Sequence, residues 1–72
     1  MGMLILEATG PRGEELAMAA AKDRGFPVGW DSEFSSATFD VDGMTDAEVK
    51  ELVFEELDSR DPDWRSQLQL VE

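Results

Sequence analysis

Residues 9 to 13, Thr-Gly-Pro-Arg-Gly, have the types that could bind a phosphate or a small carboxylate. In such a loop, glycines let backbone N–H groups approach the anion at the start of a helix. Here Glu14 and Glu15 follow in the first helical turn, where they satisfy the helix dipole and repel a phosphate. We therefore predict a simple turn from strand to helix, with Gly10 as N-cap and Pro11 as the first helical residue. The candidate ligand-binding residues, for a small carboxylate, are Gly10, Arg12 and Gly13.

Four carboxylates and one phenylalanine fall together on a helix that we predict from Thr45 to about Ser59. The α-helical repeat puts the carboxylates on one stripe, opposite much of the apolar face, and places the phenylalanine beside it. An aromatic ring flanked by carboxylates suits a basic, partly apolar protein partner. Alternatively, the stripe is only a solvated face and Phe54 packs against a neighbouring element. The candidate partner-binding residues are Glu48, Glu51, Phe54, Glu55 and Asp58.

Catalytic and metal chemistry have few candidates. The chain contains no histidine and no cysteine, so its serines lack a histidine base and a metal finds neither imidazole nor thiolate. Residues 40 to 43, Asp-Val-Asp-Gly, resemble part of a calcium loop, but the position of its bidentate carboxylate falls on Val49. We therefore expect no catalytic residue, no metal site and no cofactor, and we do not expect an enzyme.

Length and charge limit the partners. The 72 residues are enough for one domain, residues 1–72, and 17 acidic against 6 basic residues give a net charge of −11. The electrostatic field of this net charge disfavours binding to nucleic acids and anionic membranes and favours binding to cationic partners. Plain solubility and adaptation to high salt are alternative explanations of the charge. No signal peptide or membrane-spanning run is evident, which predicts a cytoplasmic protein.

Hydrophobic periodicity predicts six elements. The run Met-Leu-Ile-Leu in residues 3 to 8 is typical of a central strand buried on both faces. The other predicted elements are a helix over 14–24, strands over 28–34 and 37–41 joined at Ser35-Ser36, a helix over 45–59 and a strand over 64–71. On the strand over 28–34, the alternation puts Phe34 on the same side as Val28 and Trp30.

Local signals support the two helices. Thr45 and Glu48 form a capping box, and Gly25 is a natural residue for the end of the first helix. Glu56 falls within the apolar side of the second helix, where we expect it to pair with Arg60 one turn later. The two tryptophans, Trp30 and Trp64, are expected in the core or at its edge.

The element order β-α-β-β-α-β predicts an α+β, ferredoxin-like fold, with two helices on one face of a four-stranded antiparallel sheet in the spatial order 4-1-3-2. This topology is shared with small regulatory domains of the ACT type. The Gly10-Pro11-Arg12-Gly13 segment resembles the glycine-containing loop that follows their first strand. The resemblance implies a sensor of small ligands.

Three functional hypotheses follow. The first is a small, acidic, non-enzymatic interaction or regulatory module, acting as a homodimer or bound to a basic surface of a larger protein. It would use the Phe54 stripe and an open sheet face that carries Asp31, Glu33, Thr38 and Asp40. The second is an acidic mimic of nucleic acid that inhibits a DNA- or RNA-binding protein, suggested by the regular spacing of the stripe. The third is the ACT-like sensor with Arg12 in its ligand loop.

Overall fold

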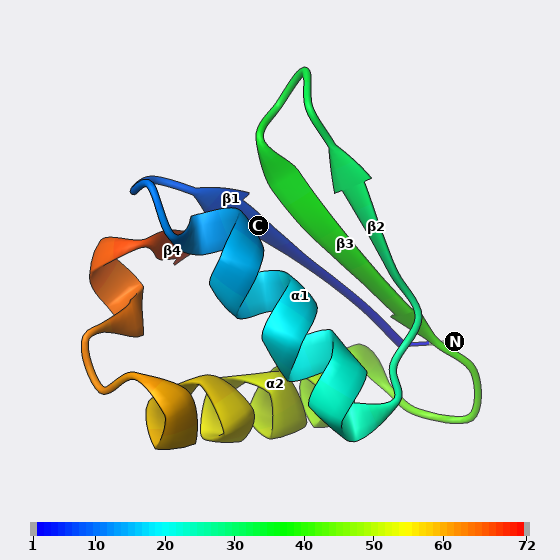
Figure 1. Cartoon of the computed structure of the whole chain (residues 1–72). Helices are drawn as coiled ribbons and strands as arrows, with labels where there is room; N and C mark the ends of the chain where they lie inside the picture. Colours follow the sequence, from blue (N-terminus) through cyan, green and yellow to red (C-terminus); the bar gives the residue numbers. More distant parts are fainter. Residues whose placement is uncertain (1, 72) are drawn as a thin grey trace.

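A four-stranded antiparallel sheet forms one layer, and two helices form the other (Figure 1). The computed structural model describes residues 2 to 71. Its elements are β1 (Gly2–Ala8), α1 (Gly13–Arg24), β2 (Val28–Asp31), β3 (Ser36–Val41), α2 (Asp46–Arg60), the 3₁₀ helix η1 (Trp64–Ser66) and β4 (Leu68–Leu70). The predicted α+β class, with two helices and a four-stranded antiparallel sheet, is confirmed.

The strands lie in the order β2-β3-β1-β4, and every neighbouring pair is antiparallel. Read from the other edge, the same neighbours run 4-1-3-2. β1 is therefore an interior strand, paired with β3 along most of its length and with β4 near its end. Leu4 lies opposite Phe39 and Leu6 opposite Ala37, so these residues point to the same face.

The core lies between that face and the helices. β1 contributes Leu4 and Leu6, and α1 covers them with Leu16 and a side built largely of alanines, whose small size lets the helix approach the sheet closely. The buried hydrophobic residues are Leu4, Leu6, Leu16, Ala17, Ala20, Ala21, Ala37, Phe39, Val41, Val49, Val53, Leu57, Trp64 and Leu68. Both tryptophans contribute, Trp64 fully buried and Trp30 half-buried at the edge.

The helix ends follow the local signals in the sequence. The hydroxyl of Thr45 accepts a hydrogen bond from the Glu48 N–H at 3.2 Å, and the Glu48 carboxylate accepts one from the Thr45 N–H at 3.0 Å. The predicted capping box is thus confirmed. α1 ends at Arg24 and is capped by Gly25, whose φ of 70° is left-handed and whose N–H bonds to carbonyls of the last turn.

The hairpin differs from the prediction. β2 ends at Asp31, three residues earlier than expected, and residues 32 to 35 form a turn before β3. The Asp31 carboxylate accepts hydrogen bonds from the N–H groups of Glu33 at 2.9 Å and Phe34 at 3.4 Å. This side-chain turn competes with the ladder, so the alternation of the strand stops there. The tip of the hairpin projects beyond the helices (Figure 1).

The last predicted strand is also shorter than expected. Residues 64 to 66 form the 3₁₀ helix η1, and only Leu68–Leu70 form β4. The reason is a competing hydrogen bond, because the indole N–H of Trp64 donates to Asp58 of α2 at 2.6 Å. This bond holds the buried Trp64 ring beneath α2, so the chain turns at residues 64 to 66 and joins the sheet only at Leu68.

The glycines of the first loop provide a test of this packing. A Cβ at Gly13 would lie 2.6 Å from the Ala8 Cβ and 2.6 Å from the Gln67 carbonyl oxygen, whereas one at Gly29 meets nothing within 4 Å. We expect Gly13→Ala to lower the free energy of unfolding by about 1–3 kcal/mol through overpacking. Gly29→Ala is the matched control and should cause no loss. Urea denaturation measures both, and equal stabilities of the two variants would contradict the close contact.

Candidate interaction surfaces

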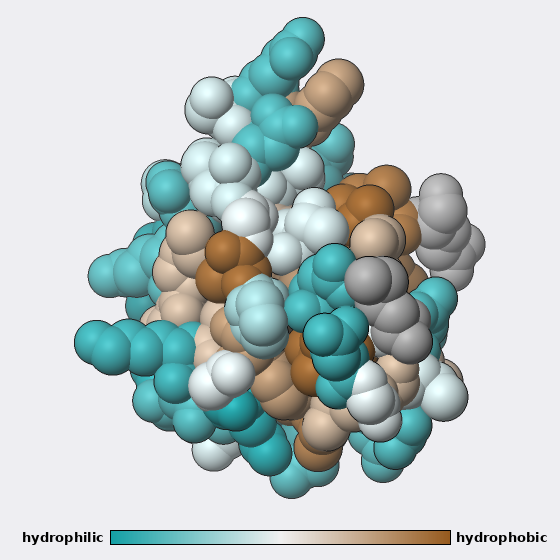
Figure 2. Space-filling view, turned by 90° about the vertical axis from the view of Figure 1, so that its right-hand side faces the viewer, coloured by the Kyte–Doolittle hydropathy of each residue, from teal (hydrophilic) through white to brown (hydrophobic). Residues whose placement is uncertain are grey.

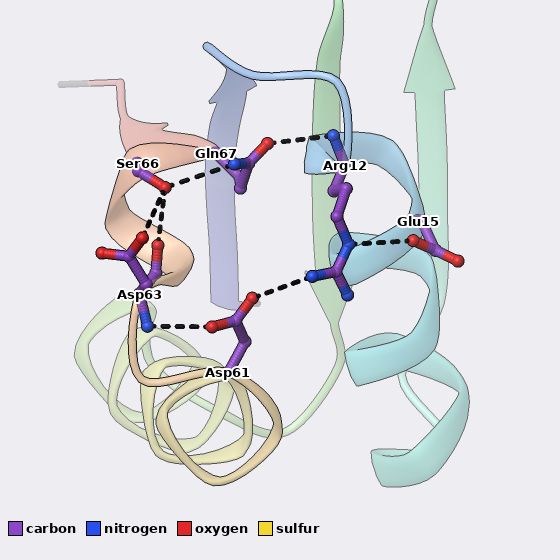
Figure 3. A network of polar contacts seen from close by, with 6 residues as sticks. All are labelled: Arg12, Glu15, Asp61, Asp63, Ser66 and Gln67. Carbon is purple, nitrogen blue, oxygen red and sulfur yellow. Dashed lines mark hydrogen bonds and ion pairs between the residues drawn. The ribbon is translucent and has the colours of Figure 1, made fainter.

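The loop after β1 is closed by Gln67 rather than open to an anion (Figure 3). The Gln67 carbonyl accepts hydrogen bonds from the N–H groups of Thr9 at 2.8 Å and Gly10 at 3.2 Å. Its side-chain oxygen accepts the Arg12 N–H at 3.0 Å. Helix α1 begins at Gly13, one residue before the predicted range 14–24, but its N-cap is Arg12, so the predicted cap at Gly10 with Pro11 as first helical residue is wrong. These hydrogen bonds hold residues 9 to 12 in a turn against Gln67, and the helix begins only after that turn.

The Arg12 side chain is already paired. Its Nε lies 3.4 Å from a Glu15 oxygen and its Nη1 lies 3.2 Å from an Asp61 oxygen, across the gap between α1 and the end of α2 (Figure 3). A Cβ at Gly10 would collide with the Gln67 side chain. The three candidate ligand-binding residues thus lie together, but two are glycines that permit close packing and the third is balanced by two carboxylates.

Some carboxylates of the acidic stripe on α2 already form hydrogen bonds within the protein. Glu48 belongs to the capping box, and Asp58 accepts hydrogen bonds from Trp64 and, at 3.3 Å, from Arg65. Glu55 lies 3.7 Å from Arg24 but keeps 68% of its side chain exposed. Among the described residues, Glu51 has no ion pair or side-chain hydrogen bond. Only Glu51 and Glu55 therefore present largely available carboxylates.

Phe54 is half-buried and packs against the buried Trp64, with ring centroids 4.9 Å apart. Arg65 and Lys50 lie over the Phe54 ring at 5.6 and 5.9 Å. This is the alternative that the sequence left open, packing against a neighbouring element. A shallow hollow of about 510 Å³ nevertheless runs along the helix; it is lined by Ala47, Lys50, Glu51, Phe54, Glu55 and Asp58.

An ion network joins the two helices behind this surface. Glu56 pairs with Arg60 at 3.2 Å, as predicted, and also with Arg24 of α1 at 3.2 Å, a contact between distant residues that the sequence did not reveal. Arg60 in turn pairs with Asp23. Side-chain hydrogen bonding with Glu56, and next with Arg60, holds the pKa of Asp23 below its usual 3.8.

The sheet face opposite the helices carries hydrophobic residues that remain exposed among residues 2 to 71. Three large hydrophobic side chains are exposed there: 44% of Met3, 64% of Phe34 and 43% of Val71. Met3 and Ile5 alternate with the buried Leu4 and therefore point to the opposite face. A hollow of about 310 Å³ on this face is lined by Ile5, Glu7, Asp31, Phe34, Ser36, Thr38 and Val71.

This arrangement corrects two predictions. β1 is buried on one face only, although its sequence is typical of a strand buried on both. Phe34 lies on the open face instead of beside Val28 and Trp30, because the Asp31 turn breaks the alternation before it. The signal that could have revealed this was the Asp-Ser-Glu segment, since aspartate often bonds to the N–H two residues later.

The open face is acidic as well as apolar. The strands carry Glu7, Asp31 and Asp40 but no lysine or arginine. One carboxylate oxygen of Asp40 is buried, and no donor among residues 2 to 71 bonds to it. Asp31 and Thr38 line the hollow as expected, whereas Glu33 lies in the turn outside the strands. From the side that Figure 2 shows, hydrophobic patches are small and hydrophilic residues lie between them.

Known proteins give no further guide to these surfaces. No family model matches the chain, and neither the curated proteins nor the solved structures include a match. Across residues 2 to 71, no helix combines the length and apolar character needed to cross a bilayer. In the same residues, no three carboxylates gather in a way that could hold a metal ion.

The division of the stripe into structural and available carboxylates is testable. Asp58→Ala leaves the buried Trp64 N–H without its acceptor, so we expect the free energy of unfolding to fall by about 1–3 kcal/mol. Glu51→Ala removes an exposed carboxylate of the same helix and should change stability by less than about 0.5 kcal/mol. Thermal or urea unfolding measures both. A loss for Glu51→Ala as large as that for Asp58→Ala would contradict the assignment.

The helix–helix network predicts a pH effect. Because the pKa of Asp23 is lowered in the folded chain, its contribution to stability is present above pH 3.8 and is lost as the pH falls through the lowered value. Replacing Arg60 by glutamine should move the Asp23 midpoint upward in a carboxyl-carbon NMR titration. Arg65→Gln lies outside the network and should leave the midpoint unchanged. An unshifted midpoint in the Arg60 variant would show that this ion pair is not populated.

Proposed function

We propose that this chain is a non-enzymatic protein-interaction module whose open sheet face binds a basic, partly apolar surface of a larger protein. The observation that carries the proposal is the exposure of Met3, Phe34 and Val71 on the face that no helix covers. The apolar run of β1 is of the kind found in strands buried on both faces. A partner seated on the open face would provide the missing cover.

The negative charge of the strands indicates which kind of partner would bind to them. The strands bear three carboxylates and no lysine or arginine, so a cationic side chain of the partner would supply the opposite charge. Such complementarity raises the rate of association and excludes acidic competitors. A second copy of the chain would instead bring its own net charge of −11 to the face, and the two copies would repel each other.

We further propose that the arrangement is the ferredoxin-like one. Its support is the strand order, which reads 4-1-3-2 from the β4 edge, with two helices packed against the sheet. In that arrangement one sheet face is free by construction, since both crossover helices occupy the other. The fold would thus serve to present a flat, four-stranded surface.

The two other hypotheses have weaker support. A nucleic-acid mimic needs regularly spaced free carboxylates, but Glu48 and Asp58 are bonded within the chain. An ACT-like sensor needs an available cation in its loop, but Arg12 is paired with Glu15 and Asp61. The strand carboxylates of the open sheet face, by contrast, form no ion pair with any residue from 2 to 71.

A capture experiment tests the proposed function. The purified chain is immobilised and exposed to a cell extract at low and high salt, beside a variant with Met3, Phe34 and Val71 all replaced by serine. We expect a basic protein to bind the unmodified chain, to be released by salt, and to be lost at least tenfold from the variant.

The control replaces three residues that lie away from the open face, Met18, Glu14 and Lys22, by serine, and should retain the partner. Light scattering of the purified chain runs in parallel. Capture that survives in the open-face variant would overturn the proposal. A stable homodimer at low salt that the same variant dissolves would also overturn it, since the face would then be covered by a second copy.

A further inference from the structure

The outer edge of β4 carries backbone groups with no strand beside them. The Gln67 carbonyl accepts from the Thr9 N–H, Gln69 lies opposite Glu7, and the Val71 N–H donates to the Ile5 carbonyl. The backbone N–H and C=O groups of the odd-numbered residues of this segment therefore point toward β1. In an antiparallel ladder the intervening residues face the other way, so the N–H and C=O groups of Leu68 and Leu70 point away from the sheet. β4 is the last strand on that side.

A groove runs beside this edge. A hollow of about 270 Å³ is lined by Phe54, Trp64, Arg65 and the whole of β4. It shares Phe54 with the larger hollow on α2, so the two adjoin across one aromatic ring. Hydrogen-bonding groups of an edge strand thus lie next to an apolar floor, with a helix forming the far wall. This is the geometry in which proteins add an extended peptide to a sheet.

The charges along the groove indicate the side chains it would accept. Asp58 and Arg65 neutralise each other at 3.3 Å. Of the remaining carboxylates of the α2 hollow, Glu55 lies 3.7 Å from Arg24, and Glu51 lies in the same hollow as its one lysine, Lys50. Glu51 is exposed and forms no ion pair among residues 2 to 71, and Glu55 keeps 68% of its side chain exposed beside Arg24, so Glu51 is the main partner that this groove offers to a positive side chain.

We propose that an extended segment of a partner protein binds along β4 as a fifth strand. One apolar side chain enters the hollow at Trp64, and a lysine or arginine two residues away on the same face reaches Glu51 and Glu55. Residues two apart in a strand lie roughly 6.5–7 Å apart on one face, which suits hollows that adjoin at Phe54. This goes beyond the proposed function, because it uses the edge of the sheet and not its open face.

A defined peptide tests the proposal on the full chain. The probe is the blocked octapeptide Thr-Val-Thr-Leu-Thr-Lys-Thr-Val, which places leucine and lysine on one face. We expect its titration to shift the backbone N–H resonances of Leu68 and Leu70 and to quench the fluorescence of Trp64. The same peptide with glutamate for lysine should bind about tenfold more weakly, and one methylated at alternate backbone nitrogens should not bind.

Matched variants separate the contributions. The double replacement Glu51→Lys and Glu55→Lys should weaken the lysine peptide about tenfold, while Glu33→Lys with Asp42→Lys makes the same change of net charge elsewhere and should not. Leu70→Pro removes one outward N–H at an edge position that tolerates proline, and should weaken binding further. Phe34→Ser disables the open face and should leave peptide binding intact.

The outcomes are decisive in either direction. Shifts at Leu68 and Leu70 that disappear with backbone methylation establish strand addition. Binding that leaves those two N–H groups unchanged, or that the Glu51 and Glu55 replacements do not weaken, overturns the proposal. Failure of the lysine peptide to bind at millimolar concentration overturns it as well, whatever the result on the open face.

Discussion

The alternation of side chains along β1 is the constraint on which the rest of this structure depends. Because β1 is hydrogen-bonded to a strand on each side, it cannot turn about its own axis. Burial of Leu4 and Leu6 under the helices therefore places Met3 and Ile5 on the opposite face. Two helices are enough to cover one face of a four-stranded sheet. The same pairing that builds the core therefore leaves apolar side chains on the outside.

The acidic residues divide into two groups with different physical roles. Each of the four arginines pairs with carboxylates, and several of these pairs join separate elements: Arg12 to the end of α2, Arg24 from α1 to α2, and Arg60 back to α1. Individually, exposed pairs contribute little stability, but together they hold the helices over a small core. Because the arginines are concentrated there, the strand carboxylates form no ion pair among residues 2 to 71.

Much of the fold could be read from the sequence where the cause is local. The Thr45 capping box, the alanine face of α1 and the Glu56–Arg60 pair all depend on residues within about one turn of each other, and all are present. What the sequence did not reveal depends on distant contacts. Arg12 meets Asp61 49 positions away, and nothing in either local segment indicates this.

How the residues of the predicted surfaces are arranged depends on both local spacing and distant contacts. The stripe on α2 follows from helical spacing, but its division into bonded and available carboxylates required the position of Trp64, whose N–H takes Asp58. The open face was expected to carry Asp31, Glu33, Thr38 and Asp40, but Glu33 lies in the turn after β2. The presence of Phe34 there escaped prediction because the side-chain turn at Asp31 moved it across the sheet. Local hydrogen bonds to Asp31, competing with strand alternation, thus determine that Phe34 joins Met3 and Val71 on this face.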